Sequence, residues 1–195
     1  DKYNKLHNYI NLENCAFNLD SLKPEQHKPE HYFNCKNSYS YDPSATCPYF
    51  DKALYEYSMQ DETWVQSFWE IAGYCLRGDF PFQKMFWFTG SSGRNGKGTV
   101  IRILEALVGD DFTISDIETR ELRDKFYSTR FIGKRLASAG DMHIRLANVS
   151  KLKQLTGGDK QVTDRKWQDI KSFNNTAKFI FAMNKLPELP DGESI

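Results

Sequence analysis

A glycine-rich stretch in the middle of the chain has the residue types that bind phosphate. It lies between an apolar run, Met85–Thr89, and an amphipathic segment, Lys97–Val108. Glycines let successive backbone N–H groups converge on phosphate oxygens, and the start of a helix adds partial positive charge. Lys97 would reach the β- and γ-phosphates of a nucleotide, whereas the alternative is a glycine-rich turn without a ligand. The predicted nucleotide-binding residues are Gly93, Arg94, Asn95, Gly96, Lys97, Gly98 and Thr99.

The stretch departs at two positions from the general phosphate-loop pattern, G-x-x-x-x-G-K-[ST]. Ser91 stands where the pattern has glycine, and Gly98 stands where the pattern has a hydroxyl residue after the lysine. Thr99 is the nearest hydroxyl, so either Thr99 or a water molecule would hold the Mg²⁺ that accompanies ATP. We therefore expect ATP and Mg²⁺ as ligands, with Thr99 as a candidate metal ligand.

Two polar residues stand at the ends of later predicted strands. Asp141 follows the strand predicted at residues 134–139, and Asn184 follows the strand predicted at 177–183. A nucleotide hydrolase needs a carboxylate near the γ-phosphate to hold Mg²⁺ or polarise water, and an amide can orient that water. A solvated aspartate and an asparagine in a turn are the alternatives. We predict Lys97, Asp141 and Asn184 as catalytic residues, with Asp141 as the second Mg²⁺ ligand.

A basic segment follows between these two strands. Residues 161–171 have the pattern of a hairpin that carries Arg165, Lys166 and Lys171 around Trp167. Cations beside an exposed aromatic ring suit the neutralisation of a nucleic-acid backbone and the stacking of single-stranded bases. The alternative is a solvated hairpin with Trp167 packed inward. We predict that these four residues bind DNA.

The elements around these residues indicate an α/β fold. The three predicted strands alternate with helices at Lys97–Val108 and 148–155, which implies a parallel central sheet covered on both faces. The strand Met85–Thr89 is apolar throughout, as expected of burial on both faces. Residues 1–80 are rich in turn signals and then become helical from Ser58 or Asp61 to near Gly78. We predict two domains, a small and mostly helical module over 1–80 and a nucleotide-binding core over 81–195.

The overall composition conceals a difference in charge between the two halves. The 195 residues include 26 basic and 26 acidic side chains. Residues 1–80 carry 7 basic and 12 acidic side chains, net −5, and residues 81–195 carry 19 and 14, net +5. No apolar run approaches the ~18 residues that cross a bilayer, so we expect no membrane partner. Four cysteines without a C-x-x-C pair, and no secretory leader, favour a reduced compartment, and we expect a cytoplasmic protein.

Three short sequences, in this order, carry a resemblance to a known family. They are Gly93-Arg94-Asn95-Gly96-Lys97-Gly98-Thr99, then Leu155-Thr156-Gly157-Gly158-Asp159, then Phe181-Ala182-Met183-Asn184-Lys185-Leu186-Pro187. With them the chain resembles the superfamily 3 helicases, which are AAA+ proteins, and is most similar to the primase-helicases of poxviruses, phages and archaeal plasmids. Residues 41–48 resemble the module that precedes the motor in this family.

The resemblance implies a role for each matching residue. Lys97 would be the phosphate lysine, Asp141 the Walker B acid and Asn184 the sensor asparagine, and the hairpin after Asp159 would grip DNA. Gly140 precedes Asp141, whereas many members have two adjacent acids there. The resemblance further implies a homohexameric ring in the full-length protein, and an arginine finger beyond the sensor strand. Since Ile195 follows that strand closely, we expect this chain alone to hydrolyse ATP weakly.

The function expected from the sequence is an ATP-dependent DNA helicase motor of a viral or plasmid replication protein. It would translocate on single-stranded or forked DNA, in the cytoplasm of a host cell or in a virus factory. Two alternatives stay open: a phosphotransferase that acts on a small molecule, and a non-catalytic DNA-binding module that uses ATP as a switch. The basic hairpin argues against the phosphotransferase, while Gly98 and the single acid at Asp141 keep the switch open.

Overall fold

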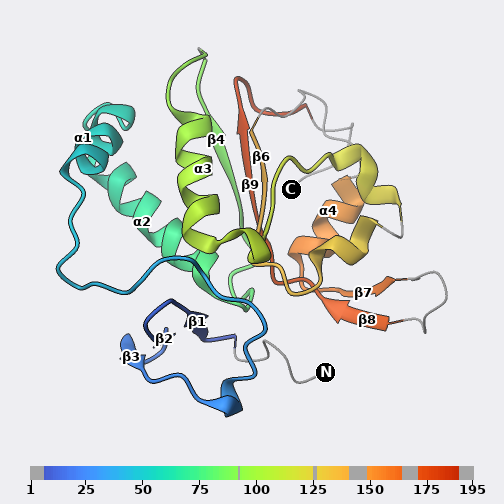
Figure 1. Cartoon of the computed structure of the whole chain (residues 1–195). Helices are drawn as coiled ribbons and strands as arrows, with labels where there is room; N and C mark the ends of the chain where they lie inside the picture. The colour runs from blue at the N-terminus through green and yellow to red at the C-terminus, as the bar shows by residue number, and fades with distance from the viewer. Residues whose placement is uncertain (1–6, 92, 125–126, 141–148, 164–170, 189–195) are drawn as a thin grey trace. The chain divides into compact units, whose positions relative to one another are not determined.

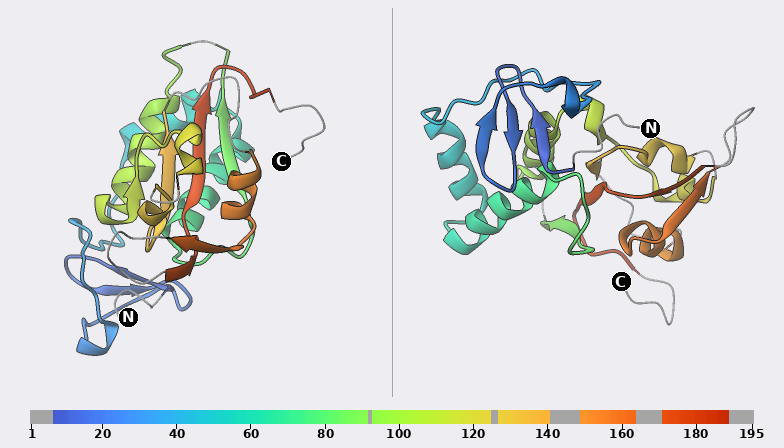
Figure 2. Two further views of the ribbon diagram at one scale, coloured as in Figure 1. Left: turned by 90° about the vertical axis from the view of Figure 1, so that its right-hand side faces the viewer. Right: turned by 90° about the horizontal axis from the view of Figure 1, so that it is seen from below.

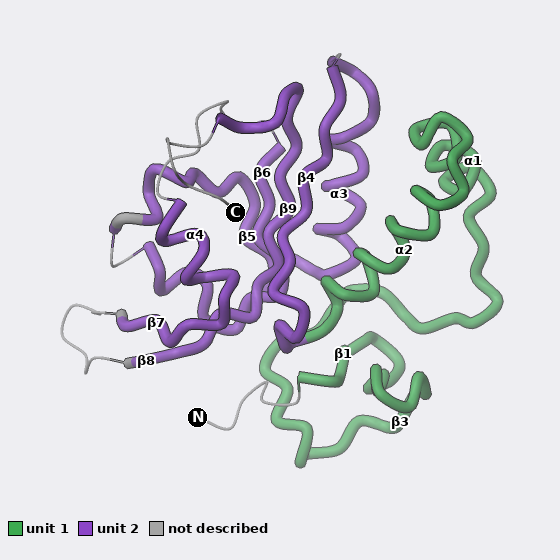
Figure 3. The backbone as a smooth tube through the Cα atoms, turned by 180° about the vertical axis from the view of Figure 1, so that it is seen from behind, with its two compact units in different colours: residues 1–77 green, residues 78–195 purple. Residues whose placement is uncertain are grey.

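A computed structural model of the chain describes residues 7–91, 93–124, 127–140, 149–163 and 171–188. The chain divides into two compact units, Asp1–Arg77 and Gly78–Ile195 (Figure 3), and each unit is described by itself. Within the described ranges, no helix combines the length and the apolar character that a membrane span requires.

Unit 1 begins with a small antiparallel sheet. Its strands are β1 (Tyr9–Asn11), β2 (Ala16–Asn18) and β3 (Lys23–Glu25), in that order, followed by the 3₁₀ helix η1 (Pro29–His31). The prediction of a mostly helical module is therefore wrong for this first part of the unit. Strands of three residues are too short to show the alternation of apolar and polar residues that identifies a strand in a sequence.

Two helices form the rest of unit 1. Helix α1 spans Pro48–Tyr57 and helix α2 spans Glu62–Leu76. The side chain of Asp61 accepts hydrogen bonds from the backbone N–H groups of Thr63 and Trp64, which confirms Asp61 as the start signal of α2.

Unit 2 is built on a parallel sheet of four strands, which confirms the predicted mixed α/β class. The strand order is β4 (Met85–Thr89), β9 (Lys178–Met183), β6 (Leu136–Ala139) and β5 (Thr113–Ile114). Helix α3 (Lys97–Val108) covers one face, and helix α4 (Val149–Thr156) lies on the other (Figures 1 and 2). Three 3₁₀ helices complete the connections: η2 (Asp110–Phe112), η3 (Thr119–Arg123) and η4 (Tyr127–Phe131).

The two faces of the sheet bury alternate residues of its central strands. Phe179, Phe181 and Met183 of β9 pack with Leu152 and Leu155 of α4 in one apolar cluster. On α3, four apolar residues are buried: Val100, Ile101, Leu104 and Val108. By contrast, β4 is only half-buried over residues 85–88, so the expectation that it is buried on both faces is wrong. The reason is that β4 is an edge strand among the described strands.

A two-stranded antiparallel hairpin follows α4. It consists of β7 (Lys160–Thr163) and β8 (Lys171–Asn174), with Lys160 paired with Asn174 and Thr163 with Lys171. The hairpin therefore forms where the sequence predicts it, and its predicted DNA-binding residues Arg165, Lys166 and Trp167 lie outside the described residues.

Candidate functional site

The glycine-rich loop, residues 90–96, joins the carboxyl end of β4 to the start of α3. Gly96 precedes the helix in the left-handed conformation, with φ 84°, which favours glycine because it lacks a Cβ. Gly90 is constrained differently: a Cβ at this position would lie 2.2 Å from Nδ2 of Asn95. The loop thus folds back on its own first residue, and a side chain at position 90 would displace the Asn95 amide.

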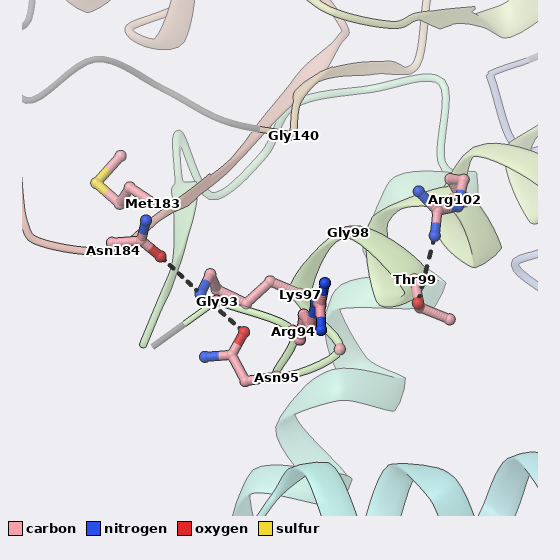
Figure 4. Close-up of a pocket in the computed structure, with 11 residues that line it drawn as sticks. Gly93, Arg94, Asn95, Lys97, Gly98, Thr99, Arg102, Gly140, Met183 and Asn184 are labelled. Atoms are coloured by element: carbon pink, nitrogen blue, oxygen red, sulfur yellow. Dashed lines mark hydrogen bonds between the residues drawn. The ribbon is translucent and has the colours of Figure 1, made fainter. Parts of the chain in front are cut away.

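The amino group of Lys97 lies among three oxygen atoms at the mouth of this loop (Figure 4). Nζ donates to the carbonyl oxygen of Gly90 at 3.1 Å, to Oδ1 of Asn95 at 2.8 Å and to Oδ1 of Asn184 at 3.2 Å. The loop after β4 and the residue after β9 are neighbours because these strands pair in parallel, with Thr89 opposite Met183. The structure thus joins two of the three predicted catalytic residues.

Asn95, Lys97 and Asn184 line one cavity of about 340 Å³, a volume within the ~300–1,000 Å³ of typical ligand sites. Its walls come from the carboxyl ends of β4, β6 and β9, where ligands bind in parallel α/β sheets. All seven predicted nucleotide-binding residues line it, together with Arg102, Gly140, Met183 and Asn184. Asp141 lies outside the described residues, and Gly140, its neighbour in the chain, is part of the wall.

Arg102 is a cavity residue that the sequence analysis missed. It lies one turn after Thr99 on α3, and its Nη2 donates to Oγ1 of Thr99 at 3.4 Å (Figure 4). The spacing of three residues on a predicted helix is the signal that could have revealed it.

This contact bears on the predicted metal site. The Thr99 hydroxyl accepts from a guanidinium, a group with the same sign of charge as Mg²⁺. No three His, Cys, Asp or Glu side chains of the described ranges cluster as metal ligands would. The described residues alone therefore do not make up a magnesium site, and the predicted carboxylate ligand, Asp141, is not among them.

The base of the hairpin is held to α4 by a polar contact. Nζ of Lys151 donates to Oε1 of Gln161 on β7 at 2.7 Å, and Gln161 is almost fully buried. Burial lowers the pKa of the Lys151 amino group from its ordinary value. This contact fixes the start of the hairpin, and Lys171, one of the four predicted DNA-binding residues, begins β8.

Comparison with protein families assigns the larger part of the chain. Residues 88–194 match a family described as "Family of unknown function (DUF5906)". The chain belongs to the DUF5906 family. Residues 1–58 match a second family, described as "D5 N terminal like", which is of the primase-helicase type. This second match covers the segment where the sequence resembles the module preceding a primase-helicase motor.

Solved structures with a similar fold include two apo structures, both A form, of the C-terminal region of NrS-1. They align with TM-scores of 0.60 and 0.57, each at 15% sequence identity. The alignments cover 75% and 77% of this DUF5906 chain, and 35% and 36% of the NrS-1 chains. The chain thus shares their fold over about a third of their length. No curated protein matches it.

Proposed function

We propose that this chain is part of the ATP-driven DNA helicase motor of a viral or plasmid replication protein, of the superfamily 3 AAA+ type. The observation that carries the proposal is the position of the Lys97 amino group. It lies at the carboxyl ends of parallel strands, between a glycine-rich loop and the Asn184 amide. The D5 N terminal like match, which points to replication proteins, supports the choice of a helicase over other nucleotide hydrolases.

The proposed site works through charge and position. The triphosphate of ATP lies over the loop, and the Lys97 ammonium exchanges neutral oxygen acceptors for phosphate oxygens. Asn184 orients the attacking water. Its Oδ1 lies 3.2 Å from Nζ of Lys97, so its amide would lie beside the phosphate that Lys97 binds. Asp141 would hold Mg²⁺, which supplies charge neutralisation at the phosphates when bound. Thr99 can be a ligand only if Arg102 moves from its hydroxyl.

In the proposed assembly, the ATP site is coupled to DNA. Arg165, Lys166, Trp167 and Lys171 on the hairpin contact a single strand, and the full-length protein forms a hexameric ring in the cytoplasm. The hairpin follows directly from α4, whose residues pack against β9, the strand that ends at Asn184. This packing offers a physical route by which a change at Asn184 can reach the hairpin.

The test is ATP hydrolysis with and without single-stranded DNA, by this chain and by a version extended at its C-terminus. We expect this chain alone to be weakly active and the extended version to be more active. We expect DNA-stimulated hydrolysis that Lys97→Ala reduces by about 10²-fold or more, because it removes the cation that stabilises the transferred phosphate. Lys185→Ala, which removes an exposed lysine next to Asn184, is the matched control and should leave hydrolysis unchanged.

Two results would contradict the proposal. Transfer of phosphate to a small acceptor without affinity for DNA would indicate a phosphotransferase. Hydrolysis unchanged by Asp141→Asn, with ATP-dependent DNA binding intact, would indicate an ATP switch in place of a motor.

A further inference from the structure

Unit 2 contains a second cavity, of about 330 Å³, away from the glycine-rich loop. The loop follows the carboxyl end of β4, whereas this cavity is lined by Met85 and Trp87 and by the two residues before β4, Gln83 and Lys84. Lys153 and Thr156 of α4, and Gly157 after it, form the opposite side. This second cavity is therefore separate from the proposed ATP site.

The Gly-Gly-Asp sequence shapes one wall of this cavity. The Gly157 N–H donates to the carbonyl oxygen of Lys153 at 2.7 Å, and Gly158 adopts a positive φ of 80°. The side-chain amide of Gln83 donates to the carbonyl oxygen of Gly157 at 2.8 Å, which ties the approach to β4 to the end of α4. Asp159 then leads directly into β7. The two glycines thus turn the chain from α4 into the hairpin, and Gly157 lines the cavity.

The chemistry of the lining suits an aromatic anion. Lys84 and Lys153 supply two ammonium groups, and the described lining residues include no carboxylate. Trp87 and Met85 are half-buried and supply an apolar floor, with the Trp87 ring packed against Phe181 at 4.9 Å between centroids. A nucleotide combines the two features that this lining would recognise, a flat base and a negative phosphate.

We propose that this cavity binds one nucleotide of single-stranded DNA, with the base against Trp87 and the phosphate between Lys84 and Lys153. The choice of DNA as the ligand rests on the proposed function, in which the hairpin binds DNA. It is continuous with the hairpin along the chain, since Gly157 lines the cavity and β7 begins three residues later at Lys160. A single strand of DNA held by the hairpin would thus continue into the cavity.

The test uses Trp87 as the reporter in the intact chain. Trp64, Trp69 and Trp167 are replaced by Phe, which leaves Trp87 as the sole tryptophan and keeps an aromatic ring at each position. Titration with a short oligo(dT), without ATP, should quench the Trp87 emission in a saturable way. Inorganic tripolyphosphate should not quench, because it offers no base to stack.

The lysines are tested in the same background. Lys84→Gln with Lys153→Gln should weaken the oligo(dT) affinity about tenfold, as expected when two phosphate-binding cations are lost. The control pair Lys52→Gln and Lys185→Gln removes the same charge from exposed positions elsewhere and should change the affinity little. Lys84→Gln alone changes an exposed side chain, so it gives a second measurement if the double variant fails to fold.

Three outcomes would overturn the subsite: no quenching by oligo(dT), equal quenching by tripolyphosphate, or equal weakening by the control pair. ATP hydrolysis measured on the same proteins separates this inference from the proposed function. Hydrolysis without quenching of Trp87 would refute the subsite and leave the motor standing. Quenching without hydrolysis, including by the version extended at its C-terminus, would refute the motor and support the subsite.

Discussion

At the scale of single residues, the surroundings of Lys97 are suited to the entry of an anion. Among its acceptors are a backbone carbonyl oxygen and two side-chain amide oxygens. These acceptors are neutral oxygens, whereas phosphate oxygens carry negative charge and bind the ammonium more strongly, so an incoming phosphate can replace them.

Asn184 should affect turnover more than binding. We expect Asn184→Ala to lower kcat for ATP by about 10²-fold, because a group that positions the reacting water acts mainly in the transition state. The dissociation constant for ATP should change less, by about fivefold to tenfold, because Lys97 also loses one of its acceptors. Steady-state kinetics and equilibrium titration of a fluorescent ATP analogue would distinguish the two effects, and an unchanged kcat would contradict the role.

Gly90 should leave room for the Asn95 amide beside Lys97. In Gly90→Ala the new Cβ would lie 2.2 Å from Nδ2 of Asn95, so the Asn95 amide must move and Lys97 loses an acceptor that positions it. We expect ATP to bind about fivefold to tenfold more weakly, as expected when one positioning hydrogen bond is lost. Gly73→Ala, where the Cβ meets no atom within 4 Å, is the control and should leave the affinity unchanged.

At the scale of elements, helix α2 gives the clearest link between sequence and stability. Its first turn is capped by Asp61, and its exposed face includes Gly73. The cap satisfies two backbone N–H groups that have no partner within the helix, and a glycine in a helix loses more backbone entropy than alanine. Two substitutions in the same helix should therefore change its stability in opposite directions.

We expect Asp61→Ala to lower the free energy of unfolding by ~1 kcal/mol, because the cap is lost. Gly73→Ala should raise it by ~0.5–1 kcal/mol, because space is open at this position and alanine favours the helix. Urea unfolding followed by circular dichroism would measure both. The same sign of change in the two variants would show that α2 is not held as described.

At the scale of the whole molecule, charge is divided between the two parts of the chain. Residues 1–80 carry a net charge of −5, and residues 81–195 carry +5. Since the basic part includes both the glycine-rich loop and the hairpin, a global charge of zero is compatible with binding to two polyanions, ATP and DNA. The salt dependence of nucleic-acid affinity should then be set by the basic residues of 81–195 alone.

We expect the pair Arg165→Gln and Lys166→Gln to reduce the slope of log affinity against log salt concentration by ~1.4 for single-stranded DNA, or ~0.7 for each lost phosphate contact. The pair Lys36→Gln and Lys52→Gln, in the acidic part, should leave the slope unchanged. Fluorescence anisotropy of a labelled oligonucleotide at several salt concentrations would measure it. Equal effects of the two pairs would indicate that the hairpin makes no specific phosphate contact.

Local patterns in the sequence were sufficient for the main helices and strands of unit 2 and for much of the candidate site. The apolar run of β4 and the helical spacing of Ile101, Leu104 and Val108 place the glycine-rich loop between a strand and a helix. The cap at Asp61 likewise follows from residue type alone. These features depend on interactions within a few residues, which the sequence displays directly.

Only the tertiary structure decided which distant residues meet. Lys97 and Asn184 are 87 positions apart, and they are neighbours because β4 pairs with β9 and not with the next strand in the chain. Lys84 and Lys153 are likewise distant in the sequence, and the fold brings them to one cavity. Strand order depends on how helices and long connections pack across the sheet, and no local pattern encodes that packing. The sequence by itself determined the glycine-rich loop between a strand and a helix, and the fold determined which distant residues lie beside it.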